Sequence, residues 1–251
     1  MPRPWLLLIP LCSLLALALP QTAFAHPLGN FTINHYARLE LQPDAIRIRY
    51  VLDEAEIPTY QELAMLHPGA GKPTAQEEQT FLAARVELLR GNLHLTVAGQ
   101  PLPLAAEPGT STLNFPPGQG GLSLLRMTVW FRATLPDGGT TPRDATFRDD
   151  NDRDRLGWKE IVVRAAGASL LQSSATAVDQ SDELRSYPQD MLSSPLDVQS
   201  AQFTFTPAAP AGGRSAAFAN LLQPRGRSVG ILQASSDAFT ALVSRQNLSP
   251  L

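Results

Sequence analysis

The stretch that decides the fold is FTINHYARLELQPDAIRIRYVLDE, which runs from Phe31 to Glu54. Its odd positions up to Leu41 are mostly apolar, and its even positions are mostly polar. After Gln-Pro-Asp at 42–44, apolar residues return at every second position from Ile46 to Leu52. A period of two is typical of a strand with one buried face, and Pro-Asp is typical of a turn. The stretch therefore predicts a β-hairpin with one face in a core.

The same alternation predicts further strands along the chain, at 93–97, 102–105, 125–133, 161–163, 169–172 and 202–205. Two segments with helical spacing interrupt them, 59–66 and 74–90. The second begins with Thr74 and Glu77 at the spacing of a capping box. We expect a mainly β fold, an immunoglobulin-like sandwich with a short helical insertion.

The first 25 residues have the three parts of a cleavable secretory signal. Arg3 is the positive start, an apolar stretch follows, and Ala23-Phe24-Ala25 supplies the small residues of a cleavage site. Cleavage leaves a chain that begins at His26 and lacks Cys12, the only cysteine. We therefore expect an exported protein, periplasmic or otherwise extracytoplasmic, that is held by its core and not by disulfides.

Composition divides the chain into four parts. These are a signal peptide at 1–25, a β-rich extracytoplasmic domain at 26–206, a Pro/Gly/Ala linker at 207–215 and a weakly ordered, juxtamembrane-like tail at 216–251, with a possible short helix at 236–244. The formal net charge of −3 becomes −4 when Arg3 is removed, and basic residues form no cluster. That balance argues against a nucleic-acid partner.

Several segments occur in the order of a known family: 26–40 (HPLGNFTINHYARLE), 53–59 (DEAEIPT), 147–151 (FRDDN) with 157–161 (GWKEI), and 237–242 (DAFTAL) with 248–251 (LSPL). They resemble the extracytoplasmic N-terminal region of bacterial nickel/cobalt efflux transporters of the NicO (RcnA-like) family. In that family the region precedes a polytopic membrane domain, which this sequence lacks. The resemblance implies a role beside a membrane transporter domain, in cis or in trans, and membrane association through a missing or separate C-terminal region.

Two histidines are candidate ligands for a divalent transition metal. Once His26 is the N-terminus, its amine and imidazole nitrogens can chelate nickel, cobalt or copper. Pro27 has no amide N–H, so further ligands must come from elsewhere. His35, on the apolar face of the first strand, is the obvious partner if the N-terminal residues fold back. The remaining ligands would come from Asp53, Glu54 or Glu56. The alternative is that His35 is an ordinary core histidine bonded to a backbone carbonyl and that His26 has no special role.

A second polar constellation, Asp149 to Asp154, partly matches a calcium loop. Asp150, Asp152 and Asp154 fit its first three ligand positions, but Arg155 stands where the turn glycine belongs and Ile161 where the last carboxylate belongs. We interpret it as a self-neutralised polar loop.

Catalysis has little support, because no Gly-x-Ser-x-Gly or His-Glu-x-x-His motif is present. His67 and His94 are expected to be solvated. The sequence thus favours an exported, non-enzymatic domain that assists nickel or cobalt handling or efflux at the membrane. The alternatives are an interaction or assembly module of a membrane protein without metal chemistry and, third, a soluble hydrolase.

Overall fold

The computed structural model describes residues 26–67, 72–136, 139–192 and 194–207. The signal segment, the linker from residue 208 onward, the tail and the possible helix at 236–244 lie outside the described residues. Within these ranges no helix combines the length and apolarity needed to cross a membrane.

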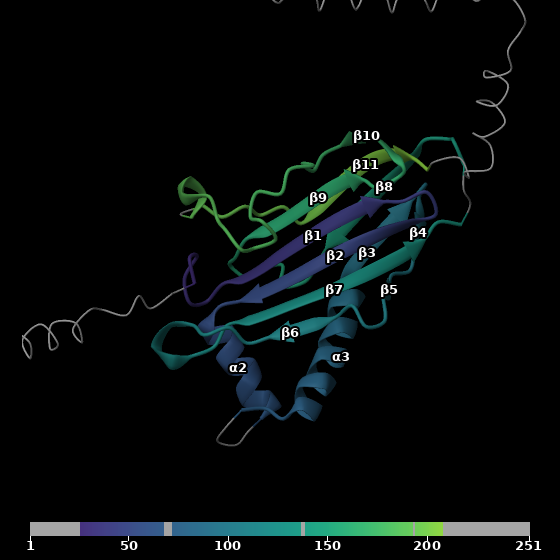
Figure 1. Ribbon diagram of the computed structural model, residues 1–251. Helices are drawn as coiled ribbons and strands as arrows, with labels where there is room; N and C mark the ends of the chain where they lie inside the picture. The colour runs from purple at the N-terminus through teal and green to yellow at the C-terminus, as the bar shows by residue number, and fades with distance from the viewer. Residues whose placement is uncertain (1–25, 68–71, 137–138, 193, 208–251) are drawn as a thin grey trace, which may run out of the picture. The chain divides into compact units, whose positions relative to one another are not determined.

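The first sheet has six strands in the order β5-β7-β2-β1-β9, with β6 also paired to β7 (Figure 1). Their bounds are β1 Ile33–Leu41, β2 Ala45–Glu54, β5 Ala105–Ala106, β6 Thr112–Asn114, β7 Leu125–Thr134 and β9 Lys159–Ala165. The predicted hairpin is confirmed: β1 and β2 pair antiparallel, from Ile33 opposite Glu54 to Leu41 opposite Ile46. On its other side β1 pairs with β9 in parallel.

The second sheet has five strands in the order β10-β11-β8-β3-β4, and all of its pairs are antiparallel. Their bounds are β3 Leu93–Val97, β4 Gln100–Pro101, β8 Arg143–Asp149, β10 Ser169–Ser173 and β11 Ser200–Thr206. The central strand β8 was not predicted, because only Ala145 and Phe147 interrupt its polar sequence. The strand expected at 102–105 is wrong. Two two-residue strands replace it: β4 ends at Pro101, and β5 begins at Ala105, the last residue of the expected run, since Pro103 between them has no backbone N–H to donate.

The main core lies between the two sheets. The alternating residues of β1, β2 and β7 meet those of β3, β8 and β11 there, including Leu39, Ile48, Phe131, Phe147 and Phe205. Two packed sheets with interdigitating apolar faces make the described part of the chain a mainly β, sandwich-like fold.

The other face of the first sheet, which we call the outer face, is also covered. The segment 174–199, which includes the 3-10 turn η2 (Gln189–Met191), crosses it. Leu184 and Tyr187 from this segment form a second cluster with Tyr36, Val51 and Trp158. The sequence predicted one buried face for the hairpin. That prediction is wrong around Tyr36 and Val51, because the segment 174–199 covers the outer face there.

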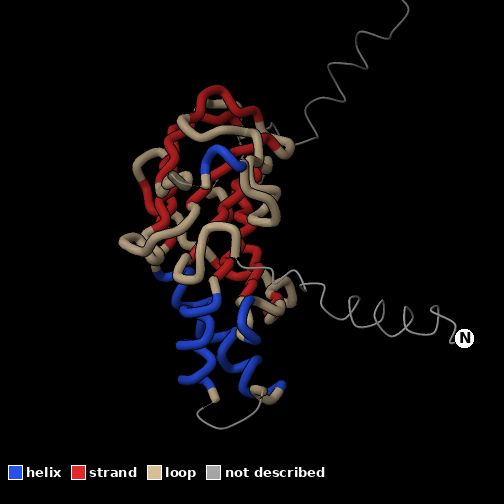
Figure 2. Tube along the Cα trace, turned by 90° about the vertical axis from the view of Figure 1, so that its left-hand side faces the viewer, coloured by secondary structure: helices blue, strands red, loops and turns tan. Residues whose placement is uncertain are grey.

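Two helices, α2 (Glu56–Leu66) and α3 (Ala75–Gly91), project together from one end of the sandwich (Figure 2). The capping box at Thr74 and Glu77 is confirmed, and α3 buries Val86 and Leu89 in the main core. Helix α2 begins earlier than predicted. Pro58 falls in its first turn, where the backbone N–H has no helical partner in any case. A further 3-10 turn, η1, spans Gln119–Gly121.

Candidate functional site

His26 is buried on the outer face, and both of its ring nitrogens have partners. Its Nε2 lies 2.8 Å from Asp53 Oδ2, and its Nδ1 lies 3.3 Å from the Thr32 hydroxyl and 3.4 Å from the Leu28 N–H. With a proton on Nε2 the ring donates to the carboxylate, and Nδ1 can accept; the nearby Asn34 amide nitrogen, 3.2 Å from Nε2, is then not hydrogen-bonded to it. Chelation through Nδ1 would have to displace those contacts.

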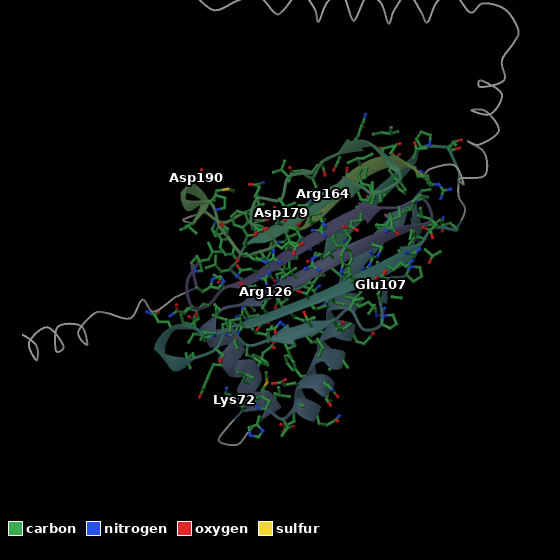
Figure 3. The ribbon with its side chains drawn as sticks, viewed as in Figure 1. Lys72, Glu107, Arg126, Arg164, Asp179 and Asp190 are labelled. Atoms are coloured by element: carbon green, nitrogen blue, oxygen red, sulfur yellow. The ribbon has the colours of Figure 1, made fainter. Side chains whose placement is uncertain are left out.

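Asp53 ties His26 into a wider polar group. Arg126, on the outer face in Figure 3, approaches Asp53 Oδ1 at 3.7 Å, and the Tyr187 hydroxyl lies 3.5 Å from Oδ2. Burial raises the pKa of Tyr187, and the charge of Asp53 adds to that shift, so the phenol stays protonated and can donate. These contacts anchor the start of the domain on the sheet.

The structure does not bring His26 and His35 together. The N-terminal residues do fold back, and the Asn34 amide nitrogen lies 3.2 Å from His26 Nε2. Asn34 and His35 are consecutive residues of a strand, however, so their side chains point to opposite faces of the sheet. His26 therefore lies on the outer face with Asn34, while His35 points into the space between the sheets.

One ring nitrogen of His35 is held by a buried relay. Nδ1 lies 2.5 Å from the Tyr50 hydroxyl, which donates to Asp149 Oδ2 at 2.7 Å. Burial and then the charge of Asp149 raise the pKa of Tyr50, so its proton stays on the phenol. Since that proton is directed at Asp149, the phenolic oxygen accepts from Nδ1–H of His35. In the neutral ring this tautomer leaves the lone pair on Nε2.

That Nε2 lies beside Asp152, which connects it to charged side chains of three further elements. Asp152 Oδ2, in the loop after β8, lies 3.4 Å away without hydrogen-bond geometry. Arg85 of α3 contacts Glu54 Oε1 at 2.6 Å, Glu62 Oε1 at 3.0 Å and Asp152 Oδ2 at 4.0 Å. We call these five residues, His35, Glu54, Glu62, Arg85 and Asp152, the His35 cluster.

Burial and charge act differently on the three carboxyl groups. Burial, and after it the charge of Glu62, raise the pKa of Glu54 to about 8, although Arg85 offsets part of the shift. Burial also raises the pKa of Glu62. Burial disfavours the ionised form of Asp152 as well, but there His35 and Arg85 outweigh it and lower the pKa. Loss of solvation therefore has the largest effect on the pKa of Glu54 and Glu62.

Three atoms of the His35 cluster that are able to ligate a metal are buried without a hydrogen-bond partner among the described residues. They are His35 Nε2, Glu54 Oε2 and Glu62 Oε2. Buried polar atoms normally find partners, so each such case calls for an explanation. As the side chains stand, no three His, Cys, Asp or Glu groups of the described chain converge closely enough to hold a metal ion.

Sequence reasoning found only part of this cluster. Glu54 was among the suggested ligands, whereas Asp152 was interpreted as part of a self-neutralised loop, and nothing in the local sequence singles out Glu62 or Arg85. Glu56 faces elsewhere and accepts the Gln119 N–H at 2.9 Å. His94 is half exposed beside Asp150, and His67 is partly covered beside Glu77.

No protein-family model, curated protein or solved structure matches this chain. The family resemblance therefore stays a prediction.

Proposed function

We propose that this chain is an exported domain that assists the handling of a divalent transition metal at the membrane, beside a transporter domain in cis or in trans. The observation that carries the proposal is the buried His35: Nδ1 is bonded through Tyr50 to Asp149, whereas Nε2, 3.4 Å from Asp152 Oδ2, has no hydrogen-bond partner among the described residues. Metal-binding histidines are commonly oriented in this way, with the far nitrogen donating to a carboxylate or carbonyl group.

The described segments that carry the family resemblance meet at one end of the sandwich. Asn34 pairs with Asp53 across β1 and β2, and its side-chain oxygen accepts the Trp158 N–H at 2.8 Å. Asp149 reaches the same end through Tyr50. Segments far apart in sequence thus meet at one end of the sandwich, on the two faces of its first sheet, which supports a shared functional role for them.

Nickel or cobalt binding is expected to depend on His35. In calorimetric titrations of the exported full chain with NiCl2 and CoCl2, His35→Gln should weaken binding at least tenfold, since it removes the only imidazole of the cluster. His94→Gln is the matched control, because His94 is the half-exposed histidine of β3. It should bind as the unchanged protein does.

Two results would contradict the proposal. One is a protein that binds neither metal. The other is binding that His35→Gln leaves intact while thermal unfolding shows the variant to be folded.

Export itself is tested by mass. Protein recovered from the extracytoplasmic fraction of an expressing bacterium should have an intact mass that corresponds to a chain starting at His26. An uncleaved N-terminus, or retention in the cytoplasm, would remove the export part of the proposal.

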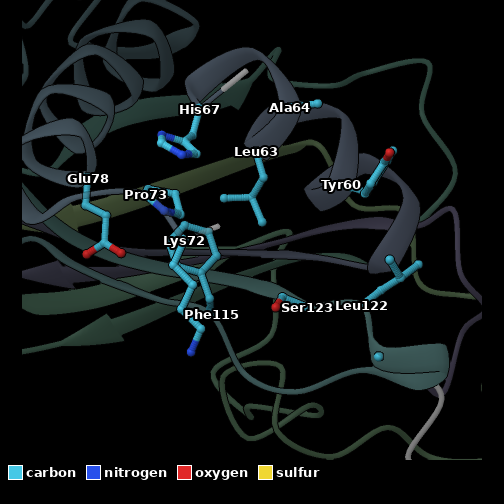
Figure 4. A pocket seen from close by; sticks show the side chains of 11 residues that line it. Tyr60, Leu63, Ala64, His67, Lys72, Pro73, Glu78, Phe115, Leu122 and Ser123 are labelled. Atoms are coloured by element: carbon cyan, nitrogen blue, oxygen red, sulfur yellow. The ribbon is translucent and has the colours of Figure 1, made fainter. Parts of the chain in front are cut away.

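A second candidate function is docking to a membrane partner without metal chemistry. The observation that favours it is a groove of about 630 Å³ at the helical end, between α2 and the loop that carries Phe115 and Leu122 (Figure 4). Tyr60 and Leu63 line it from α2, and the Tyr60 ring is largely exposed. A chain that binds no metal would favour this function.

The sandwich is further proposed to be of the immunoglobulin type. Two face-packed sheets of mainly antiparallel strands support it, and the type stays a prediction in the absence of a matching solved structure.

A further inference from the structure

The His35 cluster carries more negative than positive charge when its carboxyl groups are ionised. Glu54 is fully buried, and Glu62 and Asp152 are largely covered, yet Arg85 is the only permanent cation among them. A buried carboxylate without full compensation is costly, and native proteins usually pair it or use it to coordinate a metal. The unpartnered atoms His35 Nε2, Glu54 Oε2 and Glu62 Oε2 within the described residues therefore point to a cationic ligand, which would replace the protons that burial favours on the two glutamates.

Arg85 lies where such a ligand would act. Its guanidinium bridges Glu54 of β2 and Glu62 of α2 and approaches Asp152 from α3. The fit is incomplete, because Arg85 Nε and one oxygen of each glutamate have no hydrogen-bond partner within the described chain. One guanidinium thus contacts three carboxyl groups but does not provide hydrogen-bond partners for all of their oxygens.

We propose that the His35 cluster is a divalent-cation site that Arg85 keeps closed. His35 Nε2 and the carboxylates of Glu54, Glu62 and Asp152 are its ligands, and the cation displaces the Arg85 guanidinium when it binds. The inference rests on the proposed metal-handling function and deepens it by naming the ligand set and the residue that competes with the metal.

The geometry of the hairpin supports this ligand set. Glu54 lies opposite Ile33 and His35 lies opposite Leu52, so the two ligands share a face of adjacent strands, one diagonal step apart. Long side chains interact at that separation. Asp152 already lies 3.4 Å from His35 Nε2, which leaves Glu54 and Glu62 as the groups that must turn when Arg85 leaves.

Arg85 has a route out of the cluster. It borders a groove of about 340 Å³ between α2 and α3, lined also by Glu62, Phe81 and Leu88. An arginine side chain can keep its stem on apolar surface while its charged end enters water. Displacement therefore requires a side-chain rotation and no unfolding of α3.

The donor set defines the class of cation. One imidazole nitrogen with carboxylate oxygens suits divalent first-row ions such as Co²⁺, Ni²⁺ and Zn²⁺, whereas soft Cu(I) prefers the thiolate and thioether ligands that the cluster lacks.

The test is to remove the competing cation. Arg85→Met in the full chain should bind CoCl2 at least about tenfold more tightly than the unchanged protein, because the metal no longer displaces an internal charge. Arg90→Met is the matched control: Arg90 lies on the same helix but pairs with Glu87 at the surface. It should leave the affinity unchanged. A folded Arg85→Met protein that binds Co²⁺ no more tightly than the unchanged protein overturns the inference.

Arg85→Met leaves buried carboxylates without a charged partner, and the variant can fail to fold. A second variant therefore tests the inference independently. Glu62→Gln, with Glu87→Gln as its control on α3, should weaken Co²⁺ binding about tenfold. Unchanged affinity in Glu62→Gln also overturns the inference. If His35→Gln abolishes binding while the Arg85 and Glu62 variants change nothing, the proposed function stands and this ligand set is wrong. If the unchanged protein binds no metal, both fail.

Discussion

Replacing Gly157 by alanine is expected to destabilise the protein by about 3 kcal/mol or more, at the upper end of what overpacking costs. Gly157 is where the chain passes directly against β1, just before β9 begins. A Cβ there would collide with the backbone carbonyl of Ile33 and come within 3.0 Å of Asn34 Oδ1. Because backbone atoms of a buried central strand cannot move aside, the parallel pairing of β1 and β9 has to yield.

Thermal unfolding followed by circular dichroism measures this effect. For a domain of this size, 3 kcal/mol corresponds to a fall in Tm of roughly 6–12 °C. Gly91→Ala is the control, since Gly91 ends α3 and a Cβ there meets nothing within 4 Å. It should raise stability by about 0.5–1 kcal/mol through helix propensity. Equal Tm values for the two variants would mean that β9 does not approach β1 as described.

Tyr50→Phe is expected to cost about 2–4 kcal/mol, because one hydroxyl serves two buried groups and each stranded group costs about 1–3 kcal/mol. Without it, Nδ1 of His35 loses its acceptor and Asp149 Oδ2 loses its donor. Asp149 keeps the two bonds that Asn151 donates to its other oxygen, which limits the loss on that side. The tautomer and orientation of His35 are then no longer enforced.

The same substitution should weaken nickel or cobalt binding roughly 10–100-fold, the usual effect of removing a group that orients a metal-binding histidine. Urea unfolding and calorimetry together separate the two effects. Tyr60→Phe is the control, because Tyr60 is exposed on α2, and its stability should stay within about 0.5 kcal/mol. If Tyr50→Phe proves as stable as Tyr60→Phe, the relay does not exist; if it is destabilised but binds metal normally, Tyr50 does not orient a ligand.

Much of the fold was predictable because its signals are local. The alternation of β1 and β2 and the Pro-Asp turn between them lie within two dozen residues. The start of α3 is indicated by the spacing of Thr74 and Glu77. The strand β8 was not predictable in this way. It is buried through its neighbours β3 and β11, and its own sequence is mostly polar.

The candidate site was predictable only as separate pieces. His35 was singled out as a histidine on an apolar face, and Glu54 as a nearby carboxylate. His26 was expected to join them, but it lies on the opposite face of the sheet, to which Asn34 and Asp53 point, and Asp53 and Thr32 occupy its ring nitrogens.

By itself, then, the sequence determined the hairpin and the capped start of α3, because each depends on spacing within one segment. Only the tertiary structure decided which groups join the His35 cluster. Asp152 arrives through the loop after β8, Glu62 on α2 and Arg85 on α3, and no local pattern encodes their meeting. The physical reason is that burial and pairing of charge depend on which segments pack together, and that is set by the sandwich and its helical pair as a whole.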